Sequence, residues 1–136
     1  MKFRNIDHIG LAVKNLKVAD EFYGDILGLE QTSEETVEEE GVKTAFYKIG
    51  QISLELLEPL RDDCAVAKHL KAKGEGVQHI AFKVENVKEA MEELEKKNVW
   101  IIDETPRKGS SGTSVFFLNP ISTHGVLIEL VEEAKE

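Results

Sequence analysis

Two histidines and two glutamates have the side chains and the placement needed to bind a metal ion. His8 recurs as His79 at an offset of 71 positions, and Glu55 recurs as Glu129 at an offset of 74. Imidazole nitrogens and carboxylate oxygens suit divalent ions such as Co²⁺, Mn²⁺, Ni²⁺ or Zn²⁺. We therefore predict that these four residues bind one divalent ion per chain.

Any one of these four residues alone would be weak evidence for a metal site. One histidine in a strand is more often a hydrogen-bonded core residue than a ligand, and one glutamate there is more often an ion-pair partner. Both glutamates, however, interrupt strands that are apolar on both faces, where a lone carboxylate is costly unless it is paired or bound to metal. The duplication of both residue types therefore favours the metal site. His69, His124 and Cys64 have no such match, and we assign them no role.

The residues around each histidine belong to an internal repeat. Residues 6–19 align with residues 77–90, with apolar positions conserved between the two segments. The sequence therefore indicates one domain over 1–136, built from a first module of about 1–68 and a second of about 75–136. Residues 71–76 form the joint.

Each module is expected to run strand, helix and three strands (βαβββ), which gives an α+β fold. The expected strands of module one cover about 5–13, 29–37, 43–49 and 51–58. Those of module two cover about 77–84, 99–103, 113–118 and 125–131. Apolar residues at helical spacing predict one helix from Leu16 to Leu27 that ends at Gly28. They predict another from Val87 to Leu94, with Asn86 as its cap and Asn98 as its end.

Strand alternation predicts which faces are buried together. Ile9, Leu11 and Val13 are expected to pack under the first helix, with His8 on the opposite face. Ile80, Phe82 and Val84 are expected to pack under the second helix, with His79 opposite. A small residue, Gly10 or Ala81, stands two positions after each histidine and leaves space beside it.

Composition and charge limit the function further. The formal charge of −9 argues against nucleic acid or a membrane surface as a partner, and no apolar run is long enough to cross a bilayer. An anionic substrate would need a local cation or metal to attract it. The lone Cys64 excludes an intrachain disulfide and favours a reducing, cytoplasmic location.

The sequence resembles those of the vicinal oxygen chelate (glyoxalase/bleomycin resistance/dioxygenase) superfamily. The segments 8–13 and 79–82, each at the start of a βαβββ module, carry the resemblance, which covers nearly the whole chain. Within that superfamily, residues 22–28, 54–59, 116–120 and 125–130 look most like the methylmalonyl-CoA epimerase family.

The resemblance implies a cup-shaped mixed sheet with the helices outside. It also implies a homodimer and one metal ion, with Co²⁺ as the expected ion, on His8, Glu55, His79 and Glu129. The implied substrate is an acyl-CoA. The implied reaction interconverts (2R)- and (2S)-methylmalonyl-CoA by proton abstraction next to the thioester, through a metal-stabilised enolate. A Glu-x-Gly-Val motif of the family is matched by Glu39 to Val42, so Glu39 is the implied catalytic base, with Glu129 as the second proton-transfer group.

Other members of the superfamily remain alternatives. A glyoxalase I-like lactoylglutathione lyase would use the same four ligands. A bleomycin-type resistance protein would bind a small molecule without catalysis and has no need of four ligands. An extradiol dioxygenase uses two histidines and one carboxylate, which would leave Glu55 unexplained. The loop 106–112, rich in small residues and locally basic, could offer backbone N–H groups and cations to an anionic substrate.

Overall fold

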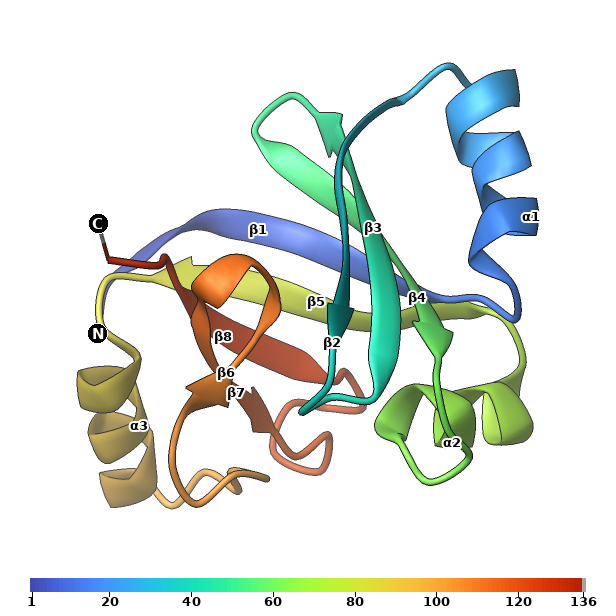
Figure 1. Ribbon diagram of the computed structural model, residues 1–136. Helices are drawn as coiled ribbons and strands as arrows, with labels where there is room; N and C mark the ends of the chain where they lie inside the picture. Colours follow the sequence, from blue (N-terminus) through green and yellow to red (C-terminus); the bar gives the residue numbers. More distant parts are fainter. Residues whose placement is uncertain (136) are drawn as a thin grey trace. The chain divides into compact units, whose positions relative to one another are not determined.

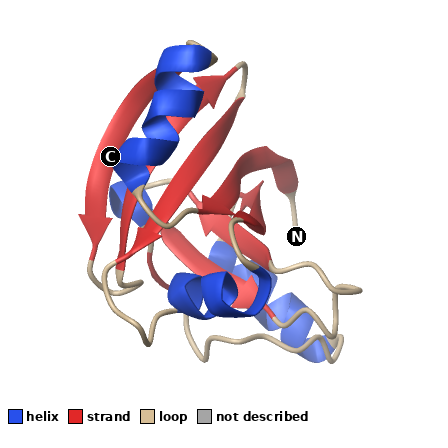
Figure 2. Cartoon of the chain, turned by 90° about the vertical axis from the view of Figure 1, so that its right-hand side faces the viewer, coloured by secondary structure: helices blue, strands red, loops and turns tan. Residues whose placement is uncertain are grey.

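The computed structural model describes residues 1–135 and consists of two compact units. The first unit is His8–Gln78. The second contains Met1–Asp7 and the chain from His79 onward. The predicted α+β fold with a mixed sheet is confirmed, because each unit combines helices with parallel and antiparallel strand pairs (Figures 1 and 2).

The first unit follows the predicted order of elements. Its strands are β1 (Phe3–Ala12), which begins in the second unit, β2 (Glu30–Val37), β3 (Val42–Ile49) and β4 (Ile52–Pro59). They lie side by side in the order β2-β3-β4-β1, with β1 parallel to β4 and the other pairs antiparallel. Helix α1 (Leu16–Asp20) continues into a π-helical segment η1 (Glu21–Ile26), and α2 (Ala65–Lys73) follows β4.

The second unit repeats this arrangement. Strand β5 (Gly76–Val84), which begins in the first unit, runs parallel to β8 (Ile128–Glu132), and β8 pairs antiparallel with β7 (Ser114–Leu118). The short β6 (Arg107–Lys108) completes the order β5-β8-β7-β6. Helix α3 (Val87–Lys96) joins β5 to this group, and a 3₁₀ turn η2 (Ser110–Gly112) precedes β7.

Asn86 caps α3 as predicted, and Asn15 caps α1, which we did not predict. The Asn86 side chain accepts a hydrogen bond from the Glu89 backbone N–H, and Asn15 does the same for Val18 at the start of α1. These contacts satisfy donors that have no partner within a helix. Gly28 has a φ of 72°, the left-handed backbone that ends many helices.

The predicted faces are confirmed for two residues in each unit, whereas Ile9 and Ile80 are half-buried and lie outside the clusters that contain the helices. Leu11 and Val13 pack with residues of α1, whereas Ala12 packs on the other face with residues of α2. Phe82 and Val84 pack with α3, whereas Ala81 joins a separate apolar cluster. The histidine of each unit is therefore on the strand face that does not carry α1 or α3.

Met1–Asp7 contacts the end of β5 and helix α3. The Phe3 and Phe82 rings meet edge to face at 5.9 Å, and the Glu85 backbone N–H donates to the Lys2 carbonyl at 3.2 Å. The Lys83 ammonium lies 3.4 Å from the Asp7 carboxylate. These seven residues therefore belong to the second unit although they precede the first in the chain.

Two predicted strands differ from the structure. The strand expected at 99–103 is reduced to an isolated bridge between Ile101 and Leu118. The Asp103 carboxylate accepts a hydrogen bond from the Phe117 backbone N–H, with 2.8 Å between nitrogen and oxygen. A side chain thus replaces the backbone carbonyl that a continuing strand would supply. The last strand starts at Ile128 rather than at 125, after a left-handed His124 and Gly125.

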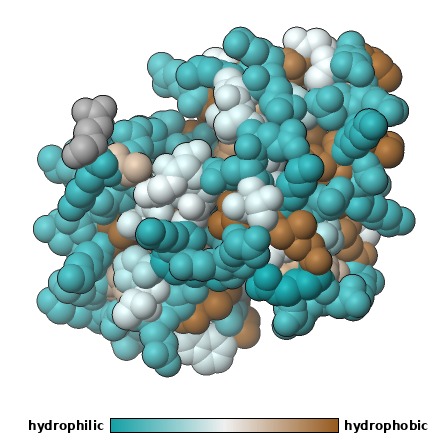
Figure 3. Space-filling model, viewed as in Figure 1, coloured by the Kyte–Doolittle hydropathy of each residue, from teal (hydrophilic) through white to brown (hydrophobic). Residues whose placement is uncertain are grey.

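The molecular surface agrees with the high share of charged residues in the sequence, 32%. The face in Figure 3 is mostly hydrophilic, with smaller hydrophobic areas between hydrophilic ones. Among residues 1–135, no helix is long and apolar enough to cross a membrane.

Candidate metal centre

The first unit holds a buried histidine–glutamate pair. His8 on β1 and Glu55 on β4 are only 6% and 3% exposed, and His8 Nε2 lies 3.3 Å from Glu55 Oε1. The two strands are parallel neighbours, with Gly10 beside Glu55. The small residue predicted to leave space is therefore next to the carboxylate.

The second unit contains the same pair with nearly the same dimensions. His79 and Glu129 are each 4% exposed, and His79 Nε2 lies 3.2 Å from Glu129 Oε1. Ala81 on β5 lies beside Glu129 on β8, as Gly10 lies beside Glu55. The duplication seen in the sequence is thus a duplication of local geometry.

The spacing within each pair fits two ligands of one metal ion. Metal–nitrogen and metal–oxygen bonds of about 2.1 Å separate two ligand atoms by about 3.0 Å at a right angle and about 3.4 Å at the tetrahedral angle. The observed separations of 3.3 and 3.2 Å fall within that range. A protonated histidine beside a carboxylate would also fit, but burial makes such an ion pair costly. The residues present therefore suit a divalent ion.

An aromatic ring supports each histidine, and our sequence analysis missed both rings. Phe46 meets His8 edge to face at 5.6 Å between ring centres, and Phe117 meets His79 in the same way at 5.7 Å. Each phenylalanine is directly across from the glutamate of its own unit in the strand pairing. The sequence did contain this signal, because Phe46 and Phe117 share the offset of 71 that relates the two histidines.

The first pair has a further partner that the sequence did not indicate. The Thr44 hydroxyl donates a hydrogen bond to Glu55 Oε2 at 2.8 Å, and Thr44 is fully buried. One carboxylate oxygen thus faces His8 and the other is bound by Thr44. This contact restricts the orientation of Glu55.

The second pair has a cation nearby. The Arg107 guanidinium lies 5.2 Å from the centre of the Phe117 ring, a cation–π distance, and 3.2 Å from Asp103. Arg107 belongs to the segment 106–112, in which the sequence predicted a basic loop. Part of that segment is β6 and part is the turn η2.

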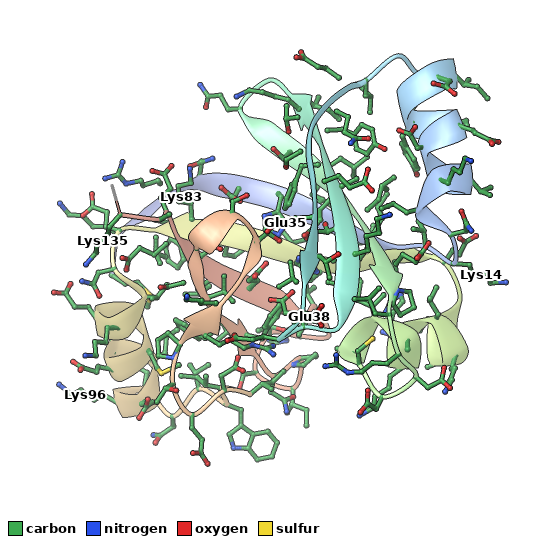
Figure 4. All side chains as sticks on the ribbon, viewed as in Figure 1. Lys14, Glu35, Glu38, Lys83, Lys96 and Lys135 are labelled. Atoms are coloured by element: carbon green, nitrogen blue, oxygen red, sulfur yellow. The ribbon has the colours of Figure 1, made fainter. Side chains whose placement is uncertain are left out.

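Glu39, the predicted catalytic base, lies in the turn between β2 and β3. Its side chain is exposed, as is that of Glu38, whereas Glu40 is half-buried. Figure 4 shows Glu38 at this end of β2, with Glu35 farther back along the strand. Gly41 ends the turn with a φ of 68°, and its carbonyl accepts a hydrogen bond from the Leu60 N–H at 2.8 Å. The turn is thus attached to the end of β4, and the catalytic role of Glu39 stays a prediction.

The remaining histidines and the cysteine lie outside these pairs. Cys64 is buried and caps α2, accepting a hydrogen bond from the Ala67 N–H. His69 is half-buried on α2, and burial, together with the nearby Lys73 charge, lowers the pKa of its imidazole. His124 is exposed.

Comparison with known proteins gives consistent matches. A family model described as the Glyoxalase/Bleomycin resistance protein/Dioxygenase superfamily matches residues 7–117. The protein YqjC of Bacillus subtilis (strain 168) is 44% identical over 127 residues, covering 93% of this chain and 91% of that protein. The mitochondrial methylmalonyl-CoA epimerase of Bos taurus is 36% identical over 126 residues, covering 92% and 72%. A structure of a Streptomyces coelicolor methylmalonyl-CoA epimerase variant in complex with 2-nitronate-propionyl-CoA is 42% identical. It covers 98% of this chain and 100% of that chain, with a TM-score of 0.94.

Proposed function

The chain belongs to the glyoxalase/bleomycin resistance protein/dioxygenase superfamily, and on that premise we propose that it is a metal-dependent methylmalonyl-CoA epimerase. The enzyme would interconvert (2R)- and (2S)-methylmalonyl-CoA. The observation that carries the proposal is the duplicated, buried histidine–glutamate pair, in a chain 42% identical to an epimerase bound to 2-nitronate-propionyl-CoA.

We propose that His8, Glu55, His79 and Glu129 bind one divalent ion, with Co²⁺ as the first candidate and Mn²⁺, Ni²⁺ or Zn²⁺ as alternatives. His8, His79 and Glu129 support this because each is buried and offers a ligand atom of the kind that holds such an ion. The separation of 3.3 Å between His8 and Glu55 supports the inclusion of Glu55. When bound, the ion supplies Lewis acidity toward the negative charge that forms on the thioester oxygen.

Substrate charge also has to be accommodated. Methylmalonyl-CoA is anionic and the chain carries a formal charge of −9, so a local cation is required to favour binding. Arg107 on the Phe117 ring is one such cation in the second unit. The acyl-CoA assignment is consistent with this placement.

Epimerisation requires a proton to leave one face of the α-carbon and another to arrive at the opposite face. We assign Glu39 to one face and Glu129 to the other, since carboxylates can serve as both proton acceptors and donors. Glu129 would then have two roles, as a metal ligand and as a proton-transfer group. We further propose a cytoplasmic homodimer, in line with the family resemblance and the single cysteine.

The test is α-proton exchange in deuterated water. Protein loaded with Co²⁺ should incorporate deuterium into methylmalonyl-CoA, as measured by mass, and protein stripped with a chelator should not. A chain that exchanges no deuterium but converts the glutathione hemithioacetal of methylglyoxal would be a glyoxalase I-like lyase instead. Failure with both substrates, despite bound metal, would refute the enzymatic proposal.

Variants of the acidic turn test the assignment of the base. Glu39→Gln should abolish exchange from one epimer while Co²⁺ binding stays unchanged, because the exposed Glu39 is not among the proposed ligands. Glu38→Gln is the matched control, since Glu38 is an exposed neighbour in the same turn. If Glu38→Gln abolishes exchange and Glu39→Gln does not, the assignment of Glu39 is wrong.

A further inference from the structure

The two histidine–glutamate pairs differ at one buried position next to the glutamate. In the first unit, Thr44 lies two residues before Phe46 on β3, and Phe46 is across from Glu55. In the second unit, Val115 lies two residues before Phe117 on β7, and Phe117 is across from Glu129. Thr44 and Val115 are therefore equivalent in the strand register, at the same offset of 71 as the histidines.

The two side chains have nearly the same shape but different chemistry. Thr44 is 0% exposed and Val115 is 1% exposed, so both occupy closely packed positions. The Thr44 hydroxyl donates to Glu55 Oε2 at 2.8 Å, whereas Val115 has no hydrogen to donate to Glu129. A buried hydroxyl needs a hydrogen-bond partner, and Glu55 provides it.

The two carboxylate oxygens of Glu55 face different partners. Oε2 is bound by Thr44, and Oε1 is left facing His8 Nε2 at 3.3 Å. A hydrogen bond to an ionised oxygen is stronger than one between neutral groups, and it fixes the rotation of the carboxylate about its last bond. Groups that hydrogen-bond a metal ligand in this way orient the ligand and raise the affinity of the site.

We propose that Thr44 is a positioning residue that fixes the orientation of Glu55 in the metal centre. The inference rests on the proposed metal-dependent function. It concerns how Glu55 is oriented as a ligand and assigns Thr44 no part in proton transfer.

Three substitutions test the proposal, with the dissociation constant for Co²⁺ measured by titration calorimetry on the full chain. Thr44→Val keeps the shape and removes the hydroxyl, and it should weaken Co²⁺ binding by about 10–100-fold. Thr44→Ser keeps the hydroxyl and removes a methyl group, and it should bind Co²⁺ nearly as tightly as the parent. Val115→Thr makes the reverse exchange in the second unit and should not weaken binding.

The pattern separates positioning from packing. If Thr44 acted only by filling space, Thr44→Ser would be the more damaging change and Thr44→Val would retain the parent affinity, which would overturn the proposal. An equal loss in Val115→Thr would also overturn it, because any exchange of valine and threonine would then disturb the site. A parent chain that binds no divalent ion refutes the proposed function and this inference together. A parent that binds, with Thr44→Val unchanged, refutes the inference alone.

Discussion

Replacement of either buried histidine by glutamine should remove most of the stabilisation that Co²⁺ gives to the fold. Glutamine can still hydrogen-bond the neighbouring glutamate, but it is a poor ligand for a divalent ion. The two pairs have nearly equal spacings of 3.3 and 3.2 Å and similar burial. His8→Gln and His79→Gln should therefore lose metal-dependent stability to the same extent.

The size of the effect follows from linkage. Free Co²⁺ at 100 times its dissociation constant stabilises the folded state by about 2.7 kcal/mol. An unfolding entropy of about 2.1 cal/mol/K per residue, over 136 residues, converts this to a rise in Tm of about 9 °C. Loss of a direct ligand should weaken binding by at least about 100-fold, since removing a group that only hydrogen-bonds a ligand costs 10–100-fold. At the same concentration the variants would gain only about 0.4 kcal/mol, or about 1.5 °C.

The assay is thermal unfolding by circular dichroism of chelator-treated protein, with and without Co²⁺. His69→Gln is the matched control, because His69 is a half-buried histidine on α2 and is not part of either pair. It should keep the full rise in Tm. A full rise in His8→Gln or His79→Gln would refute the placement of that histidine in the metal centre, and unequal losses would refute the equivalence of the two pairs.

Three further predictions concern charge and pH. Burial, and next the hydrogen bond to Asp20, raise the pKa of the Tyr47 phenol in the folded protein. The contribution of Tyr47 to the free energy of unfolding is therefore complete below the unfolded pKa of about 10. It is lost as the pH rises above that value. Tyr47→Phe should lose about 1–2 kcal/mol at neutral pH in urea unfolding and should be less sensitive than the parent to alkaline pH. Burial and the charge of Lys73 lower the pKa of His69 in the folded protein. On acidification the unfolded chain therefore protonates His69 at a higher pH than the folded chain does. The free energy of unfolding of the parent falls as the pH drops through 6.5. In His69→Gln, the free energy of unfolding should fall less steeply over the same pH range. A slope against pH equal to that of the parent would contradict this account. Arg107→Gln should raise the KM for methylmalonyl-CoA more than it lowers kcat, and an unchanged KM in steady-state assays would exclude a role in substrate binding.

Much of the fold could be predicted because strand alternation and helix spacing are local properties. The apolar residues around Leu11 and Phe82 alternate with small or polar ones, and that pattern alone identified the face under each helix. The matching histidines and glutamates could also be found, because the internal repeat compares the sequence with itself.

Other features depend on contacts that the local pattern does not contain. The end of the strand expected at 99–103 is set by the hydrogen bond from Phe117 to Asp103, 14 positions away. The contact of Thr44 with Glu55 depends on the register of β3 against β4. The π-helical segment after α1 appears in the backbone bond from the Leu27 N–H to the Phe22 carbonyl, which the apolar spacing does not distinguish from an ordinary helical turn.

The placement of Met1–Asp7 has a consequence for the order of folding events. During synthesis these residues emerge well before Lys83 and Glu85, and Arg4 is separated from its partner Glu85 by 81 positions. Contacts so distant in sequence carry a large loop-closure cost and slow the folding of a chain. The residues of His8–Gln78 are contiguous and can acquire their structure while the leading segment still awaits its partners. The Phe3–Phe82 contact should therefore be among the last to form on the ribosome, and the Glu85 N–H that is bonded to the Lys2 carbonyl should be among the first protected amides to exchange.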